Sequence, residues 1–132
     1  MPRRTHVAIV RPELVPALLH GEKRIETRFY RSRRSPYGQI AVGDIVHFKR
    51  TGGGLFGSTQ VTSAKEVGNL TTREFDQLQQ RYARRVRASA AYWRQKRRSR
   101  YGVLIGLGAL VQPPANLAVP RQFGTAWLVL DH

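Results

Sequence analysis

Three charged residues of complementary chemistry stand close together early in the chain: Lys23, Glu26 and Arg28, shortly after Gly21. A lysine whose pKa is lowered by desolvation can transfer protons, and a protonated lysine can bind a phosphate or a carbonyl oxygen. A glutamate beside it can orient the edge of a nucleobase or hold the arginine in position. The structural alternative is a Glu26–Arg28 pair on an exposed strand, which is worth under about 1 kcal/mol.

The spacing of these residues decides whether they can share one pocket. Residues 22–28 are predicted to form a strand, in which Glu26 and Arg28 lie on one face and Lys23 lies on the other. All three side chains can meet only if the chain bends near Lys23. Gly21, just before it, permits such a bend.

Short strands and one helix are predicted around this segment. The β-branched stretch His6–Val10 indicates a first strand, and a helix opened by Arg11-Pro12-Glu13 ends at Gly21. Residues 45–49 and 55–67 are predicted to be the two strands of a hairpin, because Thr51 and three glycines stand between them.

A long amphipathic helix is predicted to follow the hairpin. Thr71 and Glu74 fit a capping box, and apolar residues then recur every three or four positions as far as about Gln95. The other faces of this helix carry arginines that we expect to contact a nucleic-acid backbone: Arg81, Arg84 and Arg85.

The C-terminal third is predicted to complete the sheet. Residues 101–111 indicate an apolar strand bent at Gly106 and Gly108, and residues 125–130 indicate a closing strand. No regular alternation of strands and helices is present, which argues against a doubly wound parallel sheet. We therefore expect one α+β domain over residues 1–132: a small, mostly antiparallel β-barrel of five to six strands flanked by two helices.

The net charge of +15 over 132 residues indicates a polyanionic partner. Residues 1–34 contribute +6 and residues 71–100 contribute +8, and only four of the basic residues are lysines. Guanidinium groups bind phosphates in a bidentate manner and stack on bases, which favours nucleic acid over an anionic membrane. At 41% hydrophobic residues, the chain can also bury a core, so it is not a disordered basic tail.

A basic loop after the first charged segment combines arginines with aromatic residues, a mixture suited to unpaired RNA bases and their backbone. Its predicted nucleic-acid contacts are Arg28, Arg31, Arg33, Arg34 and Tyr37.

Several other classes of site are excluded or unsupported by the sequence. The chain has no cysteine, so it has no disulfide-linked partner, thiolate zinc site or cysteine nucleophile. Its four histidines lack the spacing of a zinc site, and we predict no metal and no cofactor. No stretch approaches the roughly 20 apolar residues that cross a bilayer, and no signal peptide is recognisable. We expect a cytoplasmic protein without a membrane partner.

The segment Gly21-Glu22-Lys23-Arg24-Ile25-Glu26-Thr27-Arg28, followed by Gly43-Asp44 at a strand opening, resembles the ASCH domain of the PUA-like superfamily. The hallmark of that family is G-x-K-x-x-E-x-R after the first helix and then G-D-x-V. The resemblance extends over essentially the whole chain, and it implies a PUA-like barrel with a cleft for RNA or a modified nucleobase.

The resemblance also implies two enzymatic alternatives. Some ASCH members are amidohydrolases of N4-acetylcytidine, and a ribonuclease activity has been proposed for others. The amidohydrolases use a lysine, a threonine three residues on and a later glutamate. Lys23 matches the lysine, Glu26 replaces the threonine with Thr27 next to it, and Glu66 is a candidate third member. A surface charge at a strand end is an equally good interpretation of Glu66.

Three hypotheses follow from these features. The first is an RNA-binding ASCH domain with a basic cleft for single-stranded RNA or a nucleotide. The second is a hydrolase of RNA or of N4-acetylcytidine, with Lys23, Glu26 and Glu66 as candidate catalytic residues. The third is a basic adaptor that docks on a ribosome or an acidic protein without using a cleft.

Overall fold

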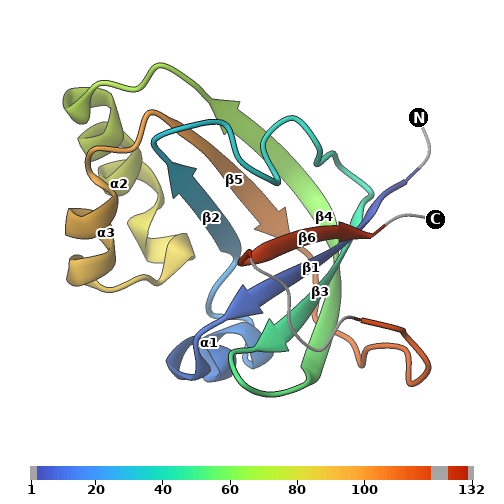
Figure 1. The fold of residues 1–132 in the computed structure, drawn as a ribbon. Coiled ribbons are helices and arrows are strands. Elements are labelled where there is room, and N and C mark those ends of the chain that lie inside the picture. The colour runs from blue at the N-terminus through green and yellow to red at the C-terminus, as the bar shows by residue number, and fades with distance from the viewer. Residues whose placement is uncertain (1–2, 120–124, 131–132) are drawn as a thin grey trace.

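The computed structural model describes residues 3–119 and 125–130, and in it six strands form one curved sheet in the order β2-β5-β4-β3-β1-β6 (Figure 1). The strands are β1 (Thr5–Val10), β2 (Ile25–Tyr30), β3 (Ile45–Arg50), β4 (Leu55–Val67), β5 (Tyr101–Leu107) and β6 (Trp127–Leu130). The α+β class is therefore confirmed. Because β2 and β6 are unpaired on their outer sides, the predicted barrel is an open half-barrel.

The sheet is mixed, since β1 and β3 run parallel while every other neighbouring pair is antiparallel. The parallel pair arises because the chain leaves β1, forms a helical segment and β2, and then returns to begin β3 in the same direction. Such a crossover is the connection that a parallel pair needs.

The helices differ from the prediction in number and length. The first is a 3₁₀ turn, η1 (Pro12–Leu14), followed by the short α1 (Val15–Leu19). The predicted long helix is two helices, α2 (Thr72–Val86) and α3 (Ala90–Lys96). None of the described helices combines the length and the hydrophobicity needed to cross a membrane.

The break between α2 and α3 has a local cause and a tertiary one. Arg87 adopts the left-handed conformation with φ 58°, which ends α2, and the Ser89 side chain accepts a hydrogen bond from Tyr92 N to begin α3. The last carbonyls of α2 are bound from the segment before β2: Arg24 N donates to Arg85 O at 2.8 Å, and the Lys23 ammonium donates to Val86 O. The sequence did not reveal this break, because apolar residues recur every three or four positions through both helices.

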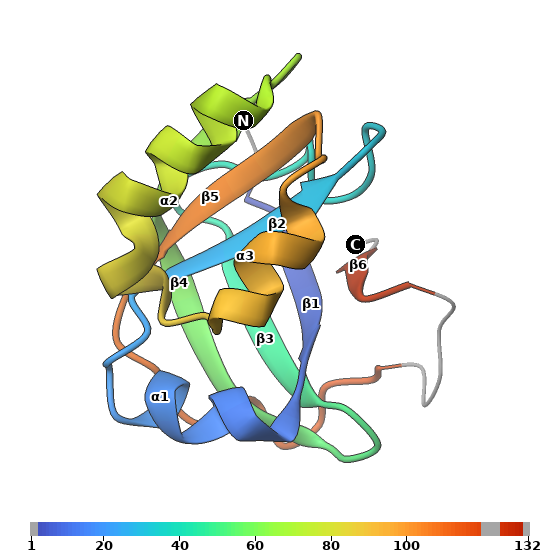
Figure 2. The same cartoon turned by 90° about the vertical axis from the view of Figure 1, so that its left-hand side faces the viewer.

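Two apolar clusters lie on the two faces of the sheet. One fills the inside of the half-barrel with residues such as Phe48, Val103 and Trp127. The other lies on the opposite face beneath α2 and α3 and includes Phe29 and Trp93 (Figure 2). Strand alternation therefore directs Ile25, Thr27 and Phe29 towards the helices, and Glu26 and Arg28 towards the inside.

Strand ends also moved relative to the prediction. β2 runs from residue 25 to residue 30 rather than from 22 to 28, β5 ends at residue 107, and β6 begins at residue 127. The register between β4 and β5 shifts between Val61 and Ser63, opposite Gly106. A Cβ atom on Gly106 would clash with the Ser63 side chain, so the glycine permits the irregularity that the sequence suggested.

Candidate functional site

A cavity of about 460 Å³ lies along the unpaired edge of β2, where the half-barrel is open. Residues 26–30 of β2 form one wall, and the end of β1 with η1 forms the opposite wall. One face of α3, from Ala91 to Lys96, and the segment before it cover one side. The cavity therefore lies where a closed barrel would have paired β2 with its next neighbour.

Glu26 places a carboxylate at this cavity, with only 5% of the residue exposed. Its Oε1 accepts a hydrogen bond from Thr27 N at 2.9 Å and lies 3.7 Å from Lys23 Nζ. Its Oε2 is buried and lies 3.6 Å from Arg28, but it accepts no hydrogen bond from any described residue. A buried acceptor of this kind is costly to leave unpaired.

Lys23 is buried, and its ammonium group donates a 2.6 Å hydrogen bond to Val86 O. Burial lowers the pKa of Lys23, the Glu26 carboxylate opposes that shift, and the Arg28 charge adds to it. The chain turns before β2, as the three-residue site required, so Lys23 and Glu26 do meet. Lys23 is nevertheless not among the described residues that line the cavity.

Arg28 spans the opening of the half-barrel. Its guanidinium group donates to Ile9 O at 3.0 Å and to Ala126 O at 3.3 Å, and it lies over the Trp127 ring at 5.1 Å from the centroid. Because β2 forms no backbone hydrogen bonds with β1 in the sheet, the Arg28 side chain directly links β2 to the end of β1 and to the residue before β6.

A pair of hydroxyl groups borders the cavity on the α3 side. Tyr92 Oη and Thr27 Oγ1 are 2.6 Å apart, and Tyr92 also donates to Thr27 O at 3.3 Å. Burial raises the pKa of Tyr92, so this phenol stays protonated and remains a donor. Tyr92 falls within the long helix predicted from the sequence, and no local pattern marked it as part of a site.

The rim of the cavity is strongly positive. The pKa of Lys96 is lowered mainly by its partial burial, and the positive charges of Arg28, Arg11 and Arg34 lower it further. Lys96 and Arg34 also lie over the Tyr30 ring, at 5.6 and 5.0 Å from its centroid. Among the described ion pairs, none neutralises Lys96, Arg11 or Arg34. An anion at this rim would relieve the repulsion.

The other predicted residues lie in three places. Arg31, Arg33 and Tyr37 follow β2 in the loop, where Arg33 lies over the Tyr101 ring at 5.2 Å and Tyr37 meets that ring edge-on. Glu66 is on β4, accepts a 2.6 Å hydrogen bond from Gly38 N, and is not a lining residue of the cavity.

The predicted helix arginines occupy the exposed surface of α2, away from the lining of the cavity. Arg81 and Arg85 lie over the Tyr82 ring at 5.5 and 5.0 Å, and Lys65 of β4 lies over it at 5.8 Å. Arg84 is exposed on the same helix. These residues form a second basic surface.

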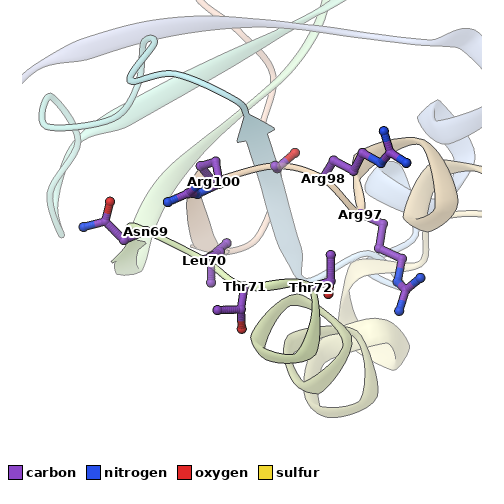
Figure 3. A pocket seen from close by; sticks show the side chains of 8 residues that line it. Asn69, Leu70, Thr71, Thr72, Arg97, Arg98 and Arg100 are labelled. Carbon is purple, nitrogen blue, oxygen red and sulfur yellow. The ribbon is translucent and has the colours of Figure 1, made fainter.

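A smaller cavity of about 320 Å³ lies beside the start of α2, lined in part by Arg97, Arg98 and Arg100. Figure 3 shows these three side chains pointing in different directions. Arg97 is paired with Asp76 at 2.8 Å, and the capping box between Thr71 and Glu74 occupies the helix end. This cavity therefore lacks the converging groups of the larger one.

The described histidines are engaged in structural pairs or exposed. His6 Nε2 lies 2.9 Å from Asp44, His6 Nδ1 accepts from Trp127 Nε1 at 3.0 Å, and His47 Nδ1 lies 2.6 Å from Ser58 Oγ. Across residues 3–119 and 125–130, no three His, Asp or Glu side chains come together as metal ligands.

Comparison with known proteins finds similarity in structure rather than in sequence. A scan against protein-family models gives no match, and neither does a search of curated proteins. The crystal structure of ASCH from Zymomonas mobilis matches with a TM-score of 0.70 and 19% identity, covering 98% of this chain and 90% of that chain. Two variants of the same Zymomonas mobilis protein match with a TM-score of 0.69. A hypothetical protein matches with a TM-score of 0.55 and 20% identity over 80% of this chain and 97% of its own.

The fold defines the class of protein as a half-barrel built on a mixed sheet, with α2 and α3 on its outer face. The chain has the fold of the ASCH domain, as the motif around Lys23 and Glu26 predicted.

Proposed function

We propose that this protein is an RNA-binding ASCH domain whose larger cavity accepts one nucleotide of a single strand. The observation that carries the proposal is that one cavity combines two features: a buried carboxylate oxygen of Glu26 that accepts no hydrogen bond from a described residue, and a rim of cations that form no ion pair with a described acidic residue. The two features call for opposite ligand chemistry, a hydrogen-bond donor inside and an anion outside. A nucleotide carries both.

The base would occupy the inner part of the cavity. An ionised carboxylate only accepts hydrogen bonds, so the ligand group that suits Glu26 Oε2 is an N–H or O–H donor. The amino and imino groups at the edges of nucleobases are such donors. The volume of 460 Å³ falls within the range of about 300–1,000 Å³ that is common for small-ligand pockets.

The phosphate would lie at the rim beside Arg11 and Lys96, with Arg34 close by. A phosphate there stabilises the ammonium form of Lys96, which its surroundings otherwise disfavour. Such contacts fix the position of the strand, while the Glu26 side of the cavity would discriminate between bases.

Fluorescence anisotropy with a labelled single-stranded RNA, measured at several salt concentrations, tests this proposal. We expect a log–log salt slope of about −0.7 for each phosphate contact. Lys96→Gln should make the slope less steep by about 0.7, and Glu26→Gln should weaken binding with little change in slope. Arg73→Gln, an exposed α2 variant outside the cavity, is the control for charge alone. A flat salt response, or equal effects of Lys96→Gln and Arg73→Gln, would overturn the proposal.

A second candidate is hydrolysis of RNA or of N4-acetylcytidine. The observation that favours it is the proximity of Lys23, Glu26 and the Thr27–Tyr92 hydroxyl pair at one edge of β2. In the amide reaction, water would cleave the acetyl group from the exocyclic nitrogen to give acetate and cytidine. Chromatography of reactions with N4-acetylcytidine and gel analysis of labelled RNA test this, with Thr27→Val as a variant that keeps the shape. The absence of product from both substrates would reject it.

A further inference from the structure

A pair of tyrosines, Tyr30 on β2 and Tyr101 on β5, extends the wall of the cavity that β2 forms. We propose that Tyr30 and Tyr101 form a stacking platform for the base of a second nucleotide, next in the strand to the one that the cavity accepts. This inference rests on the proposed function, because it extends the same RNA-binding site by one nucleotide.

Strand geometry places the two tyrosines on the correct face. Glu26, Arg28 and Tyr30 alternate along β2 and all line the cavity. Tyr101 is the direct partner of Tyr30 in the antiparallel β2–β5 pair, so both side chains leave the same face of the sheet. Their Cβ atoms should therefore be about 5 Å apart.

Cations surround both rings. Arg34 and Lys96 lie over Tyr30, and Arg33 lies over Tyr101 at 5.2 Å. Cations at these positions can move from a ring to a phosphate when a strand binds, since a cation–π contact at an exposed site is weak. Arg33 is therefore a backbone contact that belongs to the platform alone, while Arg34 and Lys96 lie between the platform and the rim of the cavity.

The Tyr101 ring is held in place. The Tyr37 ring meets the Tyr101 ring edge-on, with 5.7 Å between the centroids. The Tyr101 hydroxyl group donates a hydrogen bond to Asn69 Oδ1 at 3.4 Å. Tyr101 is half-buried, so part of the ring is open to solvent. An aromatic ring that is already oriented loses little conformational entropy when a base stacks on it.

The distance along β2 suits two separately held bases. Tyr30 stands four residues beyond Glu26, which is about 13 Å of extended strand. Stacked neighbouring bases are only about 3.4 Å apart, so the two bases would be separated from each other and each would contact protein. Recognition of unstacked bases on aromatic side chains is the usual mode for single-stranded RNA.

The test compares a mononucleotide with trinucleotides that carry 2-aminopurine at the 5′ or the 3′ position. Binding to the wild-type protein should quench the fluorescence of one of the two trinucleotides, because stacking quenches 2-aminopurine. Tyr101→Leu should abolish the quenching and weaken trinucleotide binding by about 5- to 150-fold, the range for loss of one base–aromatic stack. It should leave mononucleotide affinity unchanged. Tyr101→Phe keeps the ring and should behave as wild type, which controls for loss of the hydroxyl group.

Each outcome separates this inference from the proposed function. If the mononucleotide binds but Tyr101→Leu matches wild type with both trinucleotides, the platform is overturned and the cavity proposal stands. If only trinucleotides bind, and do so through Tyr101, the platform stands and the cavity proposal fails. If no nucleotide binds to the wild-type protein, both are overturned. Wild-type quenching provides a readout that does not depend on the folding of a variant.

Discussion

The ammonium group of Lys23 is bonded to the carbonyl oxygen of Val86, the last residue of α2, across 63 positions of the sequence. This 2.6 Å hydrogen bond places a positive charge at the negative end of the helix dipole. It also joins the segment before β2 to the helical layer. The motif predicted a chemical role for Lys23. In the structure, this side chain joins the end of α2 to Glu26 in the wall of the cavity.

Replacing Lys23 should therefore reduce stability. Lys23→Met removes a charge-assisted hydrogen bond and leaves Val86 O and Glu26 without their buried cation, which should lower the free energy of unfolding by about 2–3 kcal/mol. Urea denaturation measures this loss, and Lys65→Met, at an exposed position, should change stability by no more than about 0.5 kcal/mol. Equal stability of the two variants would contradict the structural role of Lys23.

The buried His6 predicts a stability that falls in mild acid. Burial lowers the pKa of His6 below the ordinary value of 6.5, more than the Asp44 hydrogen bond raises it. Between the lowered pKa and 6.5 the unfolded chain binds more protons than the folded chain, so stability rises with pH in that window. Protonation would also turn His6 Nδ1 into a donor facing the Trp127 Nε1 donor.

Thermal unfolding between pH 5 and 8 measures the contribution of His6. We expect His6→Gln to flatten the pH dependence relative to wild type, while His20→Gln, at an exposed site, should leave it unchanged. Part of the dependence should remain, because burial also lowers the pKa of His47. A wild-type midpoint that does not change over this range would refute the prediction.

The left-handed residue between α2 and α3 predicts an unusual response to glycine. Arg87→Gly relieves a positive φ of 58° and should cost almost nothing, even though it removes the exposed contact with Glu22. Arg84→Gly, inside α2, should lower the free energy of unfolding by about 1 kcal/mol. Chemical denaturation of both variants gives the comparison, and a larger loss at position 87 than at position 84 would be the contrary result.

The second basic surface predicts dependence on RNA length. Replacing Arg81 and Arg85 together by glutamine removes two of the three cations around Tyr82. The salt slope for a long RNA should become less steep by up to about 1.4, at 0.7 for each lost phosphate contact. Mononucleotide binding should not change, since neither residue lines the cavity. If both ligands lose affinity equally, the two surfaces act as one site.

The sequence by itself determined the features that depend on near neighbours. The hairpin strand at residues 45–49, the capping box at Thr71 and the glycine at 106 each identify a local element, because the relevant contacts lie within a few residues or on one strand. The Lys23–Glu26 motif also predicted the fold that the solved structures share. Net charge indicated an anionic partner without indicating where it binds.

Only the tertiary structure decided which of these charges share a site. The half-barrel opens beside β2, so Glu26 lines one cavity with Lys96 of α3 and with Arg11, the residue before η1, while Glu66 and Arg81 lie elsewhere. The capping of Val86 O by Lys23 contributes to ending a helix whose periodicity continues in the sequence. Hydrogen bonds and electrostatic interactions between residues many positions apart leave no local pattern, because they depend on how strands pair and on where the sheet stays open.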